Sequence, residues 1–241
     1  MTSDGRQPIL AHLVELRQRL IVSSVTIVIG AVAAFVVRDW LLDVLASPYT
    51  NVADDLGLNP ELSFFDVTEG FSLAMRLSLF GGVILASPIL FYQAWAFVNP
   101  ALTKRERRWA IPLVAALVLL FGTGIAFAFW SMPRALDFLF GIQEGIEPVI
   151  RADDYFKFTI RFLLVFGVAF QFPVFLYAAS AAGLVTSDQL KQGRRWAVLI
   201  IVVIGAVVTP TGDPLTLMLL SVPLYLFYEI TIWLVKFTLR K

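Results

Sequence analysis

Residues 77–108 read LSLFGGVILASPILFYQAWAFVNPALTKRERR, and this stretch decides the fold. Its first part, residues 77–103, contains no Asp, Glu, Lys or Arg. A helix rises about 1.5 Å per residue and the hydrocarbon core of a bilayer is about 30 Å thick, so this run is long enough to cross a membrane. The basic KRERR segment that follows is typical of the cytoplasmic end of a membrane helix.

Comparable runs recur along the whole chain, which is 59% hydrophobic and has a mean hydropathy of +0.80. We therefore predict an all-α membrane protein with six transmembrane helices in one integral membrane domain, residues 1–241. The last two uncharged runs, 196–212 and 214–228, are only about 25 and 23 Å long, so we expect short fifth and sixth helices. The six predicted spans are 20–40, 72–98, 109–133, 157–182, 196–210 and 214–235.

The basic residues lie mostly on one side of the predicted spans, and this distribution indicates the orientation. Residues 43–70 are expected to form a loop, and this loop carries six acids and no base, so we expect it outside the cell. We therefore place both termini in the cytoplasm and the protein in the cytoplasmic membrane. The N-terminal tail, the loops after the second and fourth spans and the C-terminal tail carry 13 of the 19 Lys and Arg residues, namely Arg6, Arg17, Arg19, Lys104, Arg105, Arg107, Arg108, Lys191, Arg194, Arg195, Lys236, Arg240 and Lys241.

Composition excludes several classes of function. The net charge is +1, which does not indicate a nucleic-acid binder, and the chain has no Cys and one His, His12. A thiolate or imidazole metal cluster cannot be built from these residues, and motifs for nucleophilic catalysis or phosphate binding are absent. We therefore expect no enzyme activity, no cofactor and no metal. The polar first eight residues lead into an anchor that we expect to be retained.

Prolines within the predicted spans indicate helices that are not straight rods. Each proline removes a backbone donor and tends to kink its helix, and curved helices enclose a groove more easily than straight ones. Broken helices also occur in small-solute secondary transporters, which are the alternative class. Such a transporter would need charged or carbonyl ligands at mid-membrane, and the sequence shows no buried carboxylate and no internal repeat. The four prolines are Pro88, Pro112, Pro173 and Pro223.

The segment before the first span, within residues 1–19, predicts an amphipathic helix on the cytoplasmic surface. Glu15 lies four residues before Arg19, a spacing that on a helix surface gives an ion pair of about 0.3–0.5 kcal/mol. The apolar stripe of this helix consists of Ile9, Leu13, Leu16 and Leu20.

Two further polar residues have both a structural and a functional interpretation. Glu106 is the one acid in the KRERR segment, and it either balances charge locally or serves as a receptor carboxylate that binds a guanidinium bidentately. Glu15 is the candidate second carboxylate on the same side, although the sequence alone does not bring the two together. Gln171 lies at membrane depth beside Pro173, and its amide either satisfies the backbone that the proline disrupts or hydrogen-bonds to a partner helix.

Four stretches of the chain resemble the TatC family, the core receptor subunit of the twin-arginine protein translocase. The similarity covers most of the chain in order and at plausible spacing. Its most specific parts are His-Leu-x-Glu-Leu-Arg-x-Arg-Leu and Phe-Val-x-Pro-Ala-Leu-x-x-x-Glu-Arg-Arg. The four stretches are AHLVELRQRL at 11–20, FYQAWAFVNPALTKRERR at 91–108, FGVAFQFPV at 166–174 and VVTPTGD at 207–213.

The resemblance implies a fold and a function. It implies a six-span, cup-shaped protein whose Glu15 and Glu106 recognise the paired arginines of a folded cargo's signal peptide. It also implies single-span partners, TatA and TatB, near the fifth and sixth spans, a homo-oligomeric complex in lipid, and transport driven by the proton motive force. The alternative function stays a small-solute transporter.

Further positions take roles from the same resemblance. It assigns Arg17, Arg19 and Phe97 to the signal-peptide site, and Pro48 and Gln93 to structural support. Gln171, Thr209 and Asp213 are the intramembrane polar positions toward the partners. Many relatives carry Glu where this chain has Gln171, so a hydrogen bond rather than a charge is the role implied there.

Overall fold

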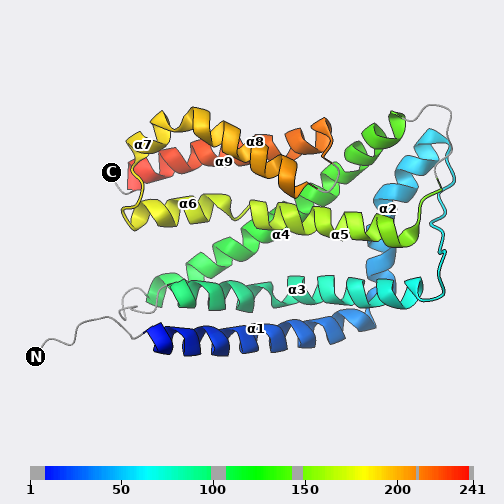
Figure 1. Cartoon of the computed structure of the whole chain (residues 1–241), viewed down its shortest axis with the longest axis horizontal. Helices are drawn as coiled ribbons and strands as arrows, with labels where there is room; N and C mark the ends of the chain where they lie inside the picture. Colours follow the sequence, from blue (N-terminus) through cyan, green and yellow to red (C-terminus); the bar gives the residue numbers. More distant parts are fainter. Residues whose placement is uncertain (1–8, 99–106, 143–148, 210–211, 239–241) are drawn as a thin grey trace, which may run out of the picture. The chain divides into compact units, whose positions relative to one another are not determined.

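The structure, a computed structural model, describes residues 9–98, 107–142, 149–209 and 212–238, and within them it is helical. An isolated bridge between Ser63 and Arg151 is the β-type pairing there. Figure 1 shows the helices in chain order. They are α1 (Ile9–Val36), α2 (Arg38–Leu56), α3 (Glu69–Val98), α4 (Arg107–Gly141), α5 (Ala152–Ala169), α6 (Phe172–Ala181), α7 (Ser187–Gln192), α8 (Arg194–Val208) and α9 (Pro214–Thr238).

The chain forms two compact units. The first contains residues 1–42 and 70–118, and the second contains residues 43–69 and 119–241. In the first unit α1 and α3 run side by side in opposite directions (Figure 1). Glycines permit this close approach, since a Cβ added to Gly82 would lie 2.6 Å from the backbone nitrogen of Ala31. Small residues of this kind are typical of helix contacts in membranes.

Five stretches of helix are long and apolar enough to cross a membrane, by length and composition. They correspond to five of the six predicted spans. The predicted fifth span corresponds to α8, which has 15 residues and a length of about 22 Å. The five stretches are Ala11–Val36, Glu69–Phe97, Ile111–Gly141, Ala152–Ala181 and Pro214–Thr238.

Two predictions about the helices were wrong. The sixth helix is not short: α9 continues through Glu229 to Thr238 and has 25 residues, because a charge near the end of an apolar run does not end a helix. Residues 43–56 are not a loop but belong to α2, which continues through Pro48. The buried side chains of α2 recur at helical spacing and show the periodicity that its low hydropathy conceals: Leu45, Pro48, Tyr49, Val52 and Ala53.

The prolines affect the helices differently. The predicted fourth span is broken at Phe170 and Gln171 into α5 and α6, and Pro173 lies in the first turn of α6, where its missing N–H costs nothing. The helices α3 and α9, in contrast, continue through Pro88 and Pro223. The first span and the amphipathic segment before it form one continuous helix, α1, which ends at Val36 instead of residue 40.

The second unit is held together by aromatic packing and a few buried hydrogen bonds. The rings of Phe162 and Phe166 in α5 are fully buried and lie 4.7 Å apart between centroids, and Phe170 packs edge-on against Phe227 of α9. The hydroxyl of Tyr155 donates to the Leu45 carbonyl at 2.7 Å and ties α5 to α2. A Cβ on Gly205 would lie 2.8 Å from Leu217, so α8 and α9 also pack closely.

Candidate binding site on the first helix

A cluster of hydrogen-bonded side chains joins the first turns of α1 to the last turns of α3. Arg19 donates to Glu15 Oε1 from both Nε, at 3.0 Å, and Nη2, at 2.6 Å. Its third nitrogen, Nη1, donates to Gln93 Oε1 at 3.0 Å. The Glu15 and Arg19 side chains are 25% and 23% exposed, so the pair is reachable from solvent. The predicted ion pair is therefore present, and Gln93 is an additional partner.

An aromatic stack borders this cluster. The imidazole of His12 lies parallel to the ring of Phe97, with 4.4 Å between the centroids and an angle of 12° between the planes. His12 Nδ1 is 3.8 Å from Glu15 Oε2, which is too far for a hydrogen bond. The Glu15 carboxylate thus has Arg19 at one oxygen and an imidazole beside the other. This contact of His12 was not predicted from the sequence, although the i, i+3 spacing of His12 and Glu15 on a helix indicates it.

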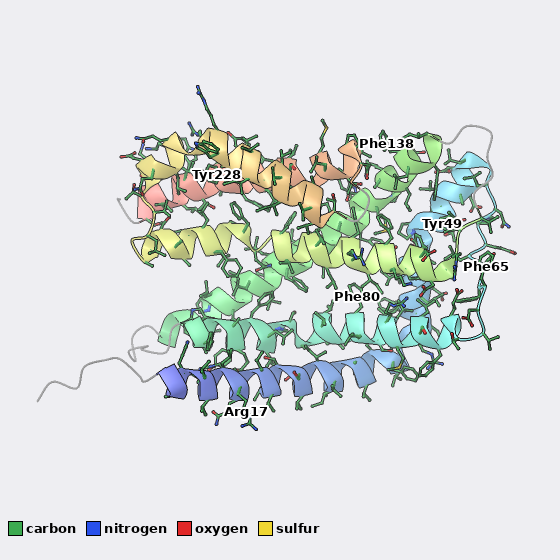
Figure 2. The ribbon with its side chains drawn as sticks, in the orientation of Figure 1. Arg17, Tyr49, Phe65, Phe80, Phe138 and Tyr228 are labelled. Atoms are coloured by element: carbon green, nitrogen blue, oxygen red, sulfur yellow. The ribbon has the colours of Figure 1, made fainter. Side chains whose placement is uncertain are left out.

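The other residues predicted for this site are placed as follows. Arg17 is exposed and projects from the side of α1 opposite α3 (Figure 2). Glu106, the predicted second carboxylate, lies outside the described residues. Convergence of Glu15 and Glu106 therefore stays a prediction.

Gln171 is 2% exposed and lies at the break between α5 and α6. Its Nε2 donates to the Gly167 carbonyl at 3.2 Å, within the same chain segment. Its Oε1 is buried and accepts no hydrogen bond from the described part of the chain. The amide therefore satisfies one backbone carbonyl near the break and leaves one acceptor available.

The remaining predicted positions, Asp213, Thr209 and Pro48, are buried. Asp213 is largely buried, and its Oδ1 accepts from the Thr216 backbone N–H at 2.8 Å, so it caps the start of α9. Thr209 is buried at the C-terminal end of α8, and Pro48 is buried inside α2.

Two ion pairs between distant segments of the chain were not predicted from the sequence. Arg151 pairs with Glu69, whose other oxygen accepts from the Phe65 backbone N–H at 2.9 Å. Arg194 holds Glu229 through two bonds of 2.7 and 2.8 Å. Each pair joins segments far apart in the chain, so no local spacing could have indicated it.

A further pair of charged residues forms a local contact within α7. Lys191 donates to Asp188 at 2.8 Å, and this hydrogen bond lowers the pKa of Asp188 below its ordinary value. Among the described residues, no three His, Asp or Glu side chains gather closely enough to hold a metal ion. The chemistry that the cluster on α1 offers is recognition of a cation by a carboxylate.

The long apolar helices of the described residues place the chain in the class of helical membrane proteins. The family model described as "Sec-independent protein translocase protein (TatC)" matches residues 11–223. The chain belongs to the TatC family. The family matches do not support the alternative of a small-solute transporter.

Individual relatives agree with this assignment. The Sec-independent protein translocase protein TatC of Aquifex aeolicus is 37% identical over 97% of this chain and 97% of its own length. The TatC of Frankia casuarinae is 31% identical over 95% of this chain, which spans 65% of that relative. The crystal structure of the twin arginine translocase receptor TatC has a TM-score of 0.77 and 38% identity, over 93% of this chain and 98% of that one.

Proposed function

We propose that this protein is the signal-peptide receptor and core component of a Sec-independent translocase, which exports folded proteins under the proton motive force. The observation that carries the proposal is the partly exposed Glu15 carboxylate on α1. A carboxylate binds a guanidinium through two parallel N–H···O bonds, and the twin arginines of a signal peptide supply two such groups. Glu106 is the proposed second carboxylate, with Arg17, Arg19 and Phe97 in the same site.

The test is binding of a labelled twin-arginine peptide to the full chain in detergent or nanodiscs, with an otherwise identical twin-lysine peptide as the ligand control. We expect Glu15→Ala and Glu106→Ala each to abolish specific crosslinking while the thermal unfolding profile is retained. A matched control is Glu61→Ala, which removes a carboxylate from the α2–α3 connection. Normal crosslinking in both receptor variants would refute the proposed site.

We infer further that α8 is a sixth span, and that both termini are cytoplasmic in the cup-shaped arrangement the resemblance implies. Because α8 packs closely along α9, it crosses the membrane if α9 does. Its length of about 22 Å is short of the hydrocarbon thickness by about 8 Å, so the bilayer must thin there.

The absence of native cysteines allows a direct test of this topology. Lys191→Cys and Lys236→Cys flank the α8–α9 pair, and Glu61→Cys reports on the α2–α3 connection. With an impermeant maleimide added outside, we expect labelling at position 61 alone. Labelling at only one of positions 191 and 236 would mean that α8 does not cross.

Single-span subunits of the TatA and TatB type are the proposed partners, and Thr209, Asp213 and Gln171 are the polar positions toward them. A groove of about 490 Å³ on the second unit supports this proposal, with Phe172, Trp196 and Tyr228 among its lining residues. Its lining is almost entirely apolar, which fits a membrane helix better than a charged solute. We expect Gln171→Leu to weaken co-purification of such a subunit more than it weakens peptide binding.

A further inference from the structure

The carboxylate proposed to receive a signal peptide already holds a guanidinium from its own helix. Arg19 donates twice to Glu15 Oε1, at 3.0 and 2.6 Å, and this contact has the same chemistry as the proposed contact with a cargo arginine. Both side chains are about three-quarters buried. In this structure the Glu15 carboxylate is therefore already paired with a cationic side chain.

An incoming guanidinium needs both oxygens of Glu15 for the favoured parallel pair of bonds. One of these oxygens, Oε1, is the acceptor of both Arg19 bonds. A cargo arginine could contact only the other oxygen while Arg19 stays in place. Bidentate recognition thus requires Arg19 to release Oε1.

Gln93 gives the released Arg19 a partner. Its Oε1 accepts from Arg19 Nη1 at 3.0 Å, and this bond does not involve Glu15. Gln93 belongs to α3, so the bond keeps the Arg19 side chain against that helix after its contact with Glu15 has opened. The hydrogen bond to Gln93 should be stronger in that state, because the guanidinium has lost its anionic partner.

We propose that Arg19 is an internal competitor that lowers the affinity of the receptor for arginine-bearing signal peptides, and that Gln93 retains Arg19 when cargo displaces it. The inference rests on the proposed function of Glu15. It assigns Arg19 a role opposite to direct contact with cargo: removing it should strengthen binding. Partly exposed ion pairs of this kind are weak, so the competitor reduces affinity without blocking the site.

The experiment measures the dissociation constant of a fluorescent twin-arginine peptide for the full chain in nanodiscs at 0.3 M salt, where long-range charge effects are screened. We expect Arg19→Gln to bind about two- to fivefold more tightly than the unaltered chain. Arg17→Gln removes the same charge from the opposite side of α1, away from Glu15, and we expect a smaller gain or a loss. Weaker binding by Arg19→Gln, or an equal gain in Arg17→Gln, would overturn the proposal.

Gln93→Leu tests the second part of the proposal. We expect it to weaken peptide binding up to about threefold in the unaltered chain and to have no effect in the Arg19→Gln background, because Gln93 acts through Arg19. An equal effect in both backgrounds would mean that Gln93 contacts the peptide itself, and its assigned role would be wrong. Unfolding profiles of all variants establish that each is folded.

Glu15→Ala separates this inference from the proposed function. If Glu15→Ala binds the peptide as the unaltered chain does, the receptor site itself is wrong. If Glu15→Ala loses binding but Arg19→Gln is not tighter, the receptor site stands and the competitor role is refuted.

Discussion

Replacing Gly82 by alanine should separate α1 from α3. The added Cβ would lie 2.6 Å from the backbone nitrogen of Ala31 and 2.8 Å from the Ile27 carbonyl oxygen. An ordinary contact begins near 3.4 Å, so the helices must move apart by about 3.4 − 2.6 = 0.8 Å. Both clashing atoms belong to the backbone and cannot rotate away. Overpacking of this kind typically costs about 1–3 kcal/mol.

Gly122→Ala is the matched control, because Gly122 is inside a helix and its added Cβ would meet nothing within 4 Å. Both variants gain the same intrinsic helix preference of about 0.5–1 kcal/mol, so their difference isolates the contact. The free energy of unfolding can be measured by SDS titration in mixed micelles and followed by tryptophan fluorescence. We expect Gly82→Ala to be about 1–3 kcal/mol less stable than Gly122→Ala. Equal stability would refute the close approach of the two helices.

Three further predictions concern the second unit. Tyr155→Phe should cost about 1–2 kcal/mol in an unfolding titration, because the buried Leu45 carbonyl loses its donor, whereas Tyr177→Phe, which removes an exposed hydroxyl, should cost almost nothing. Gln171→Met should cost about 1–2 kcal/mol, because the buried Gly167 carbonyl loses its Nε2 donor while the Oε1 without a donor among the described residues loses nothing; an unchanged unfolding midpoint would contradict that hydrogen bond. Arg151→Met should speed proteolysis between residues 57 and 68 more than Arg134→Met does, because Arg151 contacts both Glu69 and the ring of Phe65; equal cleavage rates would contradict that role.

Runs of uncharged residues predicted the long helices because crossing a membrane requires length and apolarity, and both are local properties. Hydropathy and charge did not predict the full extent of two helices, α2 and α9. The α2 helix is stabilised by burying one side, including Tyr49 and Val52, and it tolerates Pro48 inside it. The α9 helix continues past Glu229, and Arg194 and Tyr225 both donate to that carboxylate, contacts that no count of charges reveals.

The candidate site was predictable in part for a similar reason. Glu15 and Arg19 are four residues apart on one helix, so their contact follows from helical periodicity alone. The contacts to Gln93 and between His12 and Phe97 join α1 to α3 across more than 70 residues of sequence. Such contacts depend on the register of two packed helices, which a single sequence does not specify.

That register is set by the glycines, and it links the packing of the first unit to its binding site. A Cβ on Gly30 would lie 2.8 Å from the Gly82 carbonyl oxygen, so these two residues are opposite each other. From Gly30 back to Arg19 is 30 − 19 = 11 residues, and from Gly82 on to Gln93 is 93 − 82 = 11 residues. Eleven residues make about three helical turns and a rise of about 16 Å, so in two antiparallel helices the same faces meet again at that distance. The close contact in mid-helix therefore brings Arg19 opposite Gln93, and Gly82→Ala should weaken this hydrogen bond although position 82 lies far from the carboxylate.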